Sequence, residues 1–141
     1  MKMVLFICTG NTCRSPMGEG ILRALLLQRG IEDVTCESAG LYAAAGTPPS
    51  REAIRAARHY GADISRHIAR PVTEALVRNA DVLICMTPEH ARELTAKYHA
   101  PPEKIVVLDV KDPYGSDETV YDDAAYDIRE ALVRLLNQNR I

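Results

Sequence analysis

The sequence predicts an α/β protein with a parallel sheet and helices on both faces of that sheet. Short apolar runs typical of buried strands alternate with segments of helical periodicity, as in successive βαβ units. The runs at residues 3–8 and 82–86 are apolar throughout, which is typical of strands covered on both faces. The length of 141 residues fits one domain, so we expect residues 1–141 to form a single three-layer α/β/α unit.

Capping and turn residues place the boundaries of the expected elements. Strands are predicted at residues 3–8, 34–39, 82–86 and 105–108. Helices are predicted at 15–30, 48–60, 73–79 and 87–98, with a last helix that follows a loop over 109–119 and ends near residue 136. Ser15 and Pro16 resemble an N-cap and a first helical residue, and Gly30 and Gly61 are expected to end their helices.

Composition and charge exclude several classes of function. The formal net charge of −2 argues against broad binding to nucleic acid or to an anionic membrane. No apolar run approaches the roughly 20 residues that a membrane span requires. No export signal is recognised at the start of the sequence, so we expect a cytoplasmic protein with reduced thiols.

The four cysteines show neither a CxxC pair nor the spacing of a metal site. We expect Cys36 and Cys85 to be buried as small hydrophobic residues. The surroundings of Cys8 predict a different role. It ends the first strand and is followed by Thr-Gly-Asn-Thr-Cys, then Arg14, then a helix start.

The segment from Cys8 to Ser15 has the features of a phosphate-binding loop. A loop ahead of a helix can point several backbone amides at one centre and so bind an anion. Gly10 is expected to permit the backbone angles and close approach that this needs, and Asn11 tolerates a left-handed conformation. Arg14 offers two donors that match phosphoryl oxygens. This field and a hydrogen bond from Ser15 are expected to lower the pKa of Cys8 from about 8.5 to roughly 3.5–7.5.

A thiolate beneath a bound phosphoryl group is positioned to attack phosphorus and form a phosphocysteine. The leaving group then needs a proton from a general acid. Asp112, followed by Pro113, lies in the loop after the fourth predicted strand, at the same sheet edge as Cys8. We expect Asp112 to protonate the leaving group and then to act as base for the water that hydrolyses the intermediate.

These motifs resemble the low-molecular-weight protein tyrosine phosphatases over nearly the whole chain. The resemblance rests on CTGNTCRSP, on Ser38-Ala39-Gly40, on the strand VLICM and on DPYG. It implies a flavodoxin-like fold with strand order 2-1-3-4, Cys8 as nucleophile, Arg14 as transition-state binder and Asp112 as acid and base.

The resemblance also implies roles for the residues around the nucleophile. Ser15 corresponds to a serine that stabilises the thiolate, and Asn11 to an asparagine that holds the loop through a serine matching Ser38. His67 is a candidate for a further member of that network. Cys13 corresponds to a second loop cysteine that protects the nucleophile by a reversible disulfide.

Two threonines bear on the identity of the substrate. Members that act on phosphotyrosine usually carry an apolar residue where this chain has Thr9 and isoleucine or leucine where it has Thr12. With threonine at position 12, the loop resembles that of the bacterial protein-arginine-phosphatase branch. A smaller polar group leaves room for a guanidinium and can interact with its N–H groups. We expect Tyr42 and Tyr114 to wall the pocket.

Phosphorylated proteins are therefore the expected partners, with phosphoarginine favoured over phosphotyrosine. Neither a metal nor another cofactor is expected, because Arg14 and the backbone amides supply the electrostatics. We expect a monomer or a weak dimer. Two alternatives remain: a thiol-dependent arsenate reductase, for which the chain lacks a second cysteine beyond Cys85, and a non-catalytic phosphoprotein-binding module.

Overall fold

A computed structural model describes all residues from 1 to 141 and contains one sheet of four parallel strands. The strands are β1 (Lys2–Cys8), β2 (Val34–Gly40), β3 (Val82–Cys85) and β4 (Ile105–Val107). Their order is β2-β1-β3-β4, which confirms the expected topology. From β1 the chain moves first to β2 and then back across to β3. The strand order therefore reverses beyond the C-terminal ends of β1 and β3, where ligands bind in sheets of this kind.

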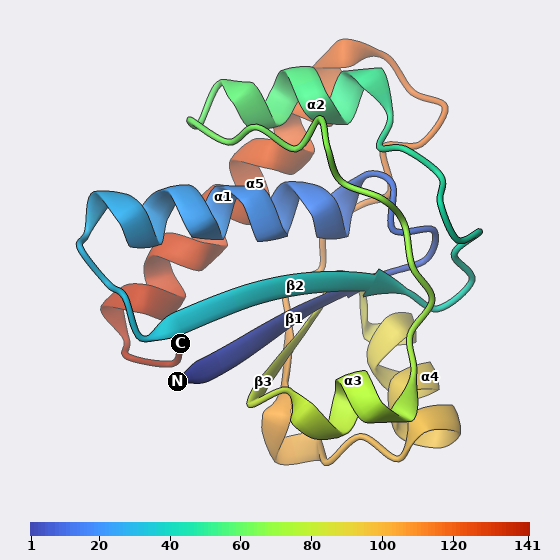
Figure 1. Cartoon of the computed structure of the whole chain (residues 1–141). Helices are drawn as coiled ribbons and strands as arrows, with labels where there is room; N and C mark the ends of the chain where they lie inside the picture. Colours follow the sequence, from blue (N-terminus) through green and yellow to red (C-terminus); the bar gives the residue numbers. More distant parts are fainter.

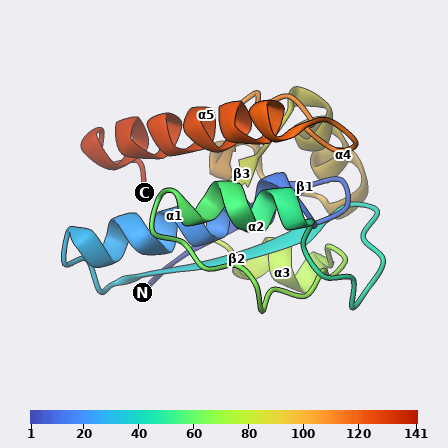
Figure 2. The ribbon, with the colours of Figure 1, turned by 90° about the horizontal axis from the view of Figure 1, so that it is seen from above.

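Helices cover both faces of the sheet, so the three-layer prediction is confirmed (Figure 1). Seen from above, α2 overlies α1, which covers the sheet, and α5 runs alongside them (Figure 2). One layer consists of α1 (Arg14–Gln28), α2 (Arg51–Arg58) and α5 (Glu118–Asn137). The opposite layer consists of α3 (Glu74–Asn79) and α4 (Pro88–Tyr98), and a short 3₁₀ turn, η1 (Pro102–Lys104), precedes β4.

The central strand β1 shows why its sequence is apolar without interruption. Val4 and Phe6 pack into the larger hydrophobic cluster, beneath α1, α2 and α5. Leu5 and Ile7 point to the opposite face and join the smaller cluster beneath α3 and α4. Successive side chains of a strand alternate between faces, so burial on both faces leaves no polar position.

Two predicted helix starts are wrong. The first helix begins at Arg14, and Ser15 lies inside its first turn instead of capping it, because the Ser15 hydroxyl faces the Cys8 sulfur. The predicted helix 48–60 is shorter at both ends and runs from Arg51 to Arg58. Its start is set by Ser50, whose side chain accepts a hydrogen bond from the Ala53 amide.

Other predictions about local structure and burial are confirmed. Gly30 and Gly61 follow α1 and α2 with φ of +68° and +78°, the left-handed conformation that glycine adopts readily. Cys36 and Cys85 are buried. None of the helices combines the length and the apolar character that crossing a bilayer requires. That residues 1–141 form one domain stays a prediction, although all four strands join in one sheet.

Candidate active site

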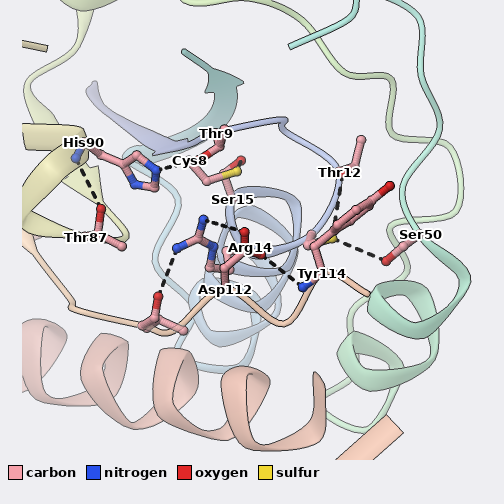
Figure 3. A network of polar contacts seen from close by, with 12 residues as sticks. Cys8, Thr9, Thr12, Arg14, Ser15, Ser50, Thr87, His90, Asp112 and Tyr114 are labelled. Atoms are coloured by element: carbon pink, nitrogen blue, oxygen red, sulfur yellow. Dashed lines mark hydrogen bonds and ion pairs between the residues drawn. The ribbon is translucent and has the colours of Figure 1, made fainter. Parts of the chain in front are cut away.

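The loop between β1 and α1 surrounds a cavity of about 220 Å³ at the C-terminal end of β1. Its lining comes from the loop and from the segment after β4, and consists of Cys8, Thr9, Gly10, Thr12, Cys13, Arg14, Asp112 and Tyr114. The predicted nucleophile, phosphate-binding arginine and general acid therefore face one space, although Asp112 is about a hundred positions away in the sequence (Figure 3).

The path of the loop depends on Asn11 and on Gly40. Asn11 has φ of +58°, the left-handed conformation, as predicted. Gly10 has no positive φ, so the expectation that it supplies unusual backbone angles is wrong. Gly40, at the end of β2, lies against the loop. A Cβ there would stand 2.6 Å from the Thr9 carbonyl oxygen and 2.9 Å from the Asn11 nitrogen. Only glycine permits this approach.

Hydrogen-bond donors converge on the sulfur of Cys8. The Ser15 Oγ lies 2.8 Å from Cys8 Sγ, and the same oxygen accepts a hydrogen bond of 2.8 Å from Asn11 Nδ2. This leaves the Ser15 hydroxyl hydrogen for the sulfur. The backbone amides of Ser15 and Asn11 also act on Cys8. An inward-facing set of donors is the arrangement that stabilises an anion at this point.

Burial and these contacts have opposite effects on the Cys8 thiol. Burial is the largest influence and raises its pKa. The Ser15 hydroxyl, the Ser15 amide, the charge of Arg14 and the Asn11 amide each lower that pKa. Burial outweighs them, so the expectation of a net lowered pKa is wrong. Sequence reasoning counted the donors and the positive charge but not the burial of Cys8, which is only 3% exposed.

Arg14 is fixed in the cavity wall by the segment after β4. It is only 4% exposed, and its Nη1 donates a hydrogen bond of 3.0 Å to the Val110 carbonyl oxygen. Its Nη2 lies 3.7 Å from Asp112 Oδ2. Anchoring by Val110 holds the guanidinium at the edge of the cavity, where its fork can face two oxygens of a phosphoryl group.

Asp112 lies across the cavity from the loop and is itself exposed. Its Oδ1 accepts a hydrogen bond of 3.0 Å from the Tyr114 amide, which orients the carboxyl group within its turn. Pro113 between them is buried. A carboxyl group that is held at the mouth, next to the guanidinium, can reach a leaving group that emerges from the cavity.

A buried polar network supports the loop from below. Asn11 Nδ2 donates to Ser38 Oγ at 3.0 Å, and the Ser38 hydroxyl donates to Glu19 at 2.6 Å. His67 Nε2 lies 2.8 Å from the Asn11 carbonyl oxygen. Asn11 Oδ1 accepts from the Arg70 amide at 3.0 Å. Ser38 and His67 thus lie where a loop-supporting role requires, and Asn11 and Ser15 are buried behind the cavity instead of lining it.

Tyr42 does not line the cavity, so the structure does not place it where the sequence analysis expected. The side chain is 60% exposed, and its hydroxyl donates to Glu93 at 2.7 Å. It also accepts from Lys97 Nζ at 2.7 Å. Both partners lie on α4, and neither of them lines the cavity. Tyr114, in contrast, lines the cavity.

Sequence reasoning missed two residues that contact the loop. His90, on α4, places its Nε2 2.9 Å from Thr9 Oγ1. Tyr121, on α5, places its hydroxyl 3.4 Å from Cys13 Sγ, and burial raises the pKa of Tyr121 to about 12. A signal for His90 existed: β1 and β3 are neighbours, so residues that follow both strands meet at one edge.

A larger cavity of about 460 Å³ lies elsewhere, between α1 and the segment 61–67. It contains neither Cys8 nor Arg14, although Glu19 and His67 connect its wall to the network beneath the loop. The smaller cavity alone combines a nucleophile, a cation and a carboxyl group. This combination defines an enzyme site for phosphorylated substrates.

Comparison with known proteins agrees with this geometry. The family described as low molecular weight phosphotyrosine protein phosphatase matches residues 3–140, and the chain belongs to this family of phosphatases. A curated relative is the protein-arginine-phosphatase of Bacillus subtilis (strain 168), which is 30% identical over 146 residues. That alignment covers 96% of this chain and 95% of the relative.

Two solved structures share the fold at high similarity. The low molecular weight protein tyrosine phosphatase from T. tengcongensis has a TM-score of 0.92 and 37% identity, with 98% of this chain and 99% of that chain covered. A mutant YwlE arginine phosphatase with a phosphorylated active-site serine has a TM-score of 0.91 and 28% identity. There the alignment covers 98% of this chain and 95% of the other.

Proposed function

We propose that this protein is a cysteine-dependent phosphatase that removes phosphate from arginine side chains of proteins. The observation that carries the proposal is the lining of one cavity by Cys8, Arg14, Asp112 and Thr12. The first three supply the chemistry of phosphate transfer, and Thr12 supplies the selection of the phosphorylated side chain.

The reaction proceeds in two displacements at phosphorus. Cys8 reacts in its deprotonated form, which the Ser15 hydroxyl, Arg14 and the loop amides favour against the effect of burial. This thiolate forms an S–P bond while the P–N bond to the arginine breaks, and Asp112 gives its proton to the leaving nitrogen. Arg14 and the loop amides stabilise charge on the phosphoryl oxygens. Asp112, now a carboxylate, takes a proton from water, whose oxygen bonds to phosphorus as the S–P bond breaks. Inorganic phosphate leaves and the thiolate is restored.

The phosphorylated serine in the related arginine phosphatase mutant supports an intermediate on the nucleophile. The name of the Bacillus subtilis relative, which spans nearly the whole chain, supports phosphoarginine as the substrate. Thr12 adds a physical reason. Its side chain is half-buried at the cavity wall, with Oγ1 3.7 Å from Cys13 Sγ. A hydroxyl there can accept a hydrogen bond from the guanidinium N–H groups of phosphoarginine. The ring of phosphotyrosine has no such donors.

Phosphotyrosine is the second candidate, because the family and the T. tengcongensis relative are named for it. The test compares kcat/KM on phosphoarginine and phosphotyrosine peptides of the same sequence, for wild type and Thr12→Ile. We expect wild type to prefer phosphoarginine and the substitution to move the ratio toward phosphotyrosine by roughly 10-fold or more. A wild-type preference for phosphotyrosine, or an unchanged ratio, contradicts the proposal. Thr12→Val, which keeps the shape and removes the hydroxyl, separates size from polarity.

Arsenate reduction has less support. Cys8 and Cys13 are the only cysteines that line the cavity, whereas Cys85 is fully buried within β3 and Cys36 within β2. A relay to two further thiols would need partners near the mouth. If this protein reduced arsenate in an assay coupled to thioredoxin, that result would support this alternative.

We further propose phosphorylated proteins as partners and the cytoplasm as the site of action. Four free thiols fit a reducing compartment. We propose a monomer or a weak dimer, which sedimentation velocity across a concentration series tests directly; a stable higher oligomer would contradict it.

A further inference from the structure

His90 is a buried histidine that contacts the catalytic loop and that the mechanism above does not use. It lies in the first turn of α4, where its backbone amide donates to the capping Thr87 Oγ1 at 3.2 Å. The side chain is 6% exposed, and Nε2 lies 2.9 Å from Thr9 Oγ1 (Figure 3). Thr9 directly follows the nucleophile and lines the cavity.

The imidazole of His90 is neutral at physiological pH. Burial and the charge of Arg14 lower its pKa to about 4, against smaller opposite effects of Glu89, Glu93 and Asp112. A neutral imidazole has one N–H donor and one acceptor nitrogen. Its contact with Thr9 therefore has a direction, which depends on the nitrogen that carries the hydrogen.

The other ring nitrogen decides that direction. Nδ1 of His90 is buried and has no hydrogen-bond partner. If Nδ1 carried the hydrogen, a donor would be buried without an acceptor, which is rare and costly, whereas an unpaired acceptor is tolerated more often. The hydrogen therefore belongs on Nε2, and Nε2 donates to Thr9 Oγ1.

This assignment determines where the Thr9 hydroxyl points. Its oxygen accepts from His90, which is its only hydrogen-bond partner in the protein, so its hydrogen is free. Thr9 is exposed, and it lines the same space as Cys8 and Arg14. That space is the one in which a phosphoryl group is bound under the proposed function.

We propose that His90 is a positioning residue that holds the Thr9 hydroxyl as an additional donor to a phosphoryl oxygen bound in the cavity. The inference rests on the proposed function only for the identity of the anion. It requires that Nε2 of His90 carries the hydrogen, and that His90 and Thr9 act together when an anion binds. The Thr9 hydroxyl, oriented by His90 on α4, then adds one neutral hydrogen-bond donor to those of Arg14 and the loop amides.

The first test needs no substitution. The ¹⁵N chemical shifts of the His90 ring in the whole wild-type protein report which nitrogen carries the hydrogen. We expect the Nε2–H tautomer near pH 7, and an Nδ1–H tautomer would overturn the proposal.

The second test measures the affinity for inorganic phosphate in a double-mutant cycle. Thr9→Val is expected to weaken phosphate binding by about 3- to 10-fold, the usual range for one neutral hydrogen bond. His90→Leu should weaken it to a similar degree, and the double variant should be no weaker than Thr9→Val alone. His90→Gln, whose amide can replace the Nε2 donor, should restore part of the loss. Additive effects of Thr9→Val and His90→Leu, or no effect of Thr9→Val, would overturn the proposal.

Neither test uses a phosphoprotein substrate. Failure of the enzyme on phosphoarginine and phosphotyrosine peptides would contradict the proposed function and leave both tests intact. Conversely, an active phosphatase with the Nδ1–H tautomer would retain its proposed function and lose the role of His90. If His90→Leu does not fold, the tautomer, Thr9→Val and His90→Gln still decide the matter.

Discussion

The hydroxyl of Ser15 lies 2.8 Å from the sulfur of Cys8, the contact that the sequence analysis expected, although Ser15 does not also cap the helix as expected. Asn11 donates to the same hydroxyl oxygen and thereby turns its hydrogen toward the sulfur. This contact is the largest of those that oppose the effect of burial on Cys8. It links loop conformation to nucleophile ionisation and leads to the first prediction.

Ser15→Ala should raise the pKa of Cys8, because the substitution removes a donor that favours the thiolate. A hydrogen bond to a charged group contributes about 1.5–3 kcal/mol, equivalent to about one to two pH units. The rate of alkylation by iodoacetamide, measured against pH, should therefore reach its half-maximum at higher pH. Ser65→Ala, at an exposed position remote from the cavity, is the control. An unchanged profile would mean that the contact does not govern ionisation.

Asp112→Asn should lower kcat by about 10²- to 10⁴-fold and leave phosphate affinity nearly unchanged, since an amide cannot protonate the leaving group. A substrate with a good leaving group should be affected less. Asp109→Asn is a matched control in the same loop: Asp109 is exposed and has φ of +61°, which asparagine also tolerates. Unchanged turnover in Asp112→Asn would exclude the acid role.

Peroxide should inactivate the enzyme reversibly through a Cys8–Cys13 disulfide. Oxidation of the Cys8 thiolate to the sulfenic acid, followed by condensation with the Cys13 thiol and loss of water, gives the bond. Dithiothreitol should then restore activity. Cys13→Ser should lose activity irreversibly, whereas Cys36→Ala, which keeps both loop thiols, should recover like wild type. Activity assays and intact mass spectrometry together measure the recovery and detect the disulfide. If Cys13→Ser recovers its activity as fully as wild type, Cys13 has no protective role.

Gly40→Ala should destabilise the fold and impair catalysis, because the new Cβ would lie 2.6 Å from the Thr9 carbonyl oxygen. Both nearest atoms are backbone, so the strain cannot be relieved by a side-chain rotation. We expect a loss of about 1–3 kcal/mol in the free energy of unfolding, measured in urea. Gly10→Ala, whose Cβ would meet only Thr12 Oγ1 at 3.7 Å, should keep its stability. A Gly40→Ala protein as stable as wild type would show that the loop backbone can shift to accommodate the new Cβ.

The sequence by itself determined the fold class, the strand order through its resemblance to the family, and the segment that carries the chemistry. Local rules suffice for these features. A strand buried on both faces must be apolar throughout, and a left-handed turn favours asparagine at position 11. That Cys8, Arg14 and Asp112 share one cavity could also be predicted, since strands of a parallel sheet deliver the residues that follow them to one edge.

Tertiary structure alone decided how strongly Cys8 is buried and that His90 and Tyr121 contact the loop from α4 and α5. Burial is a sum over all packed neighbours, and no local pattern records it. The approach of Gly40, the exclusion of Tyr42 from the cavity and the contact of His90 with Thr9 each join segments that are distant in sequence. Such contacts exist only after the sheet and both helical layers have assembled, because packing sets their distances.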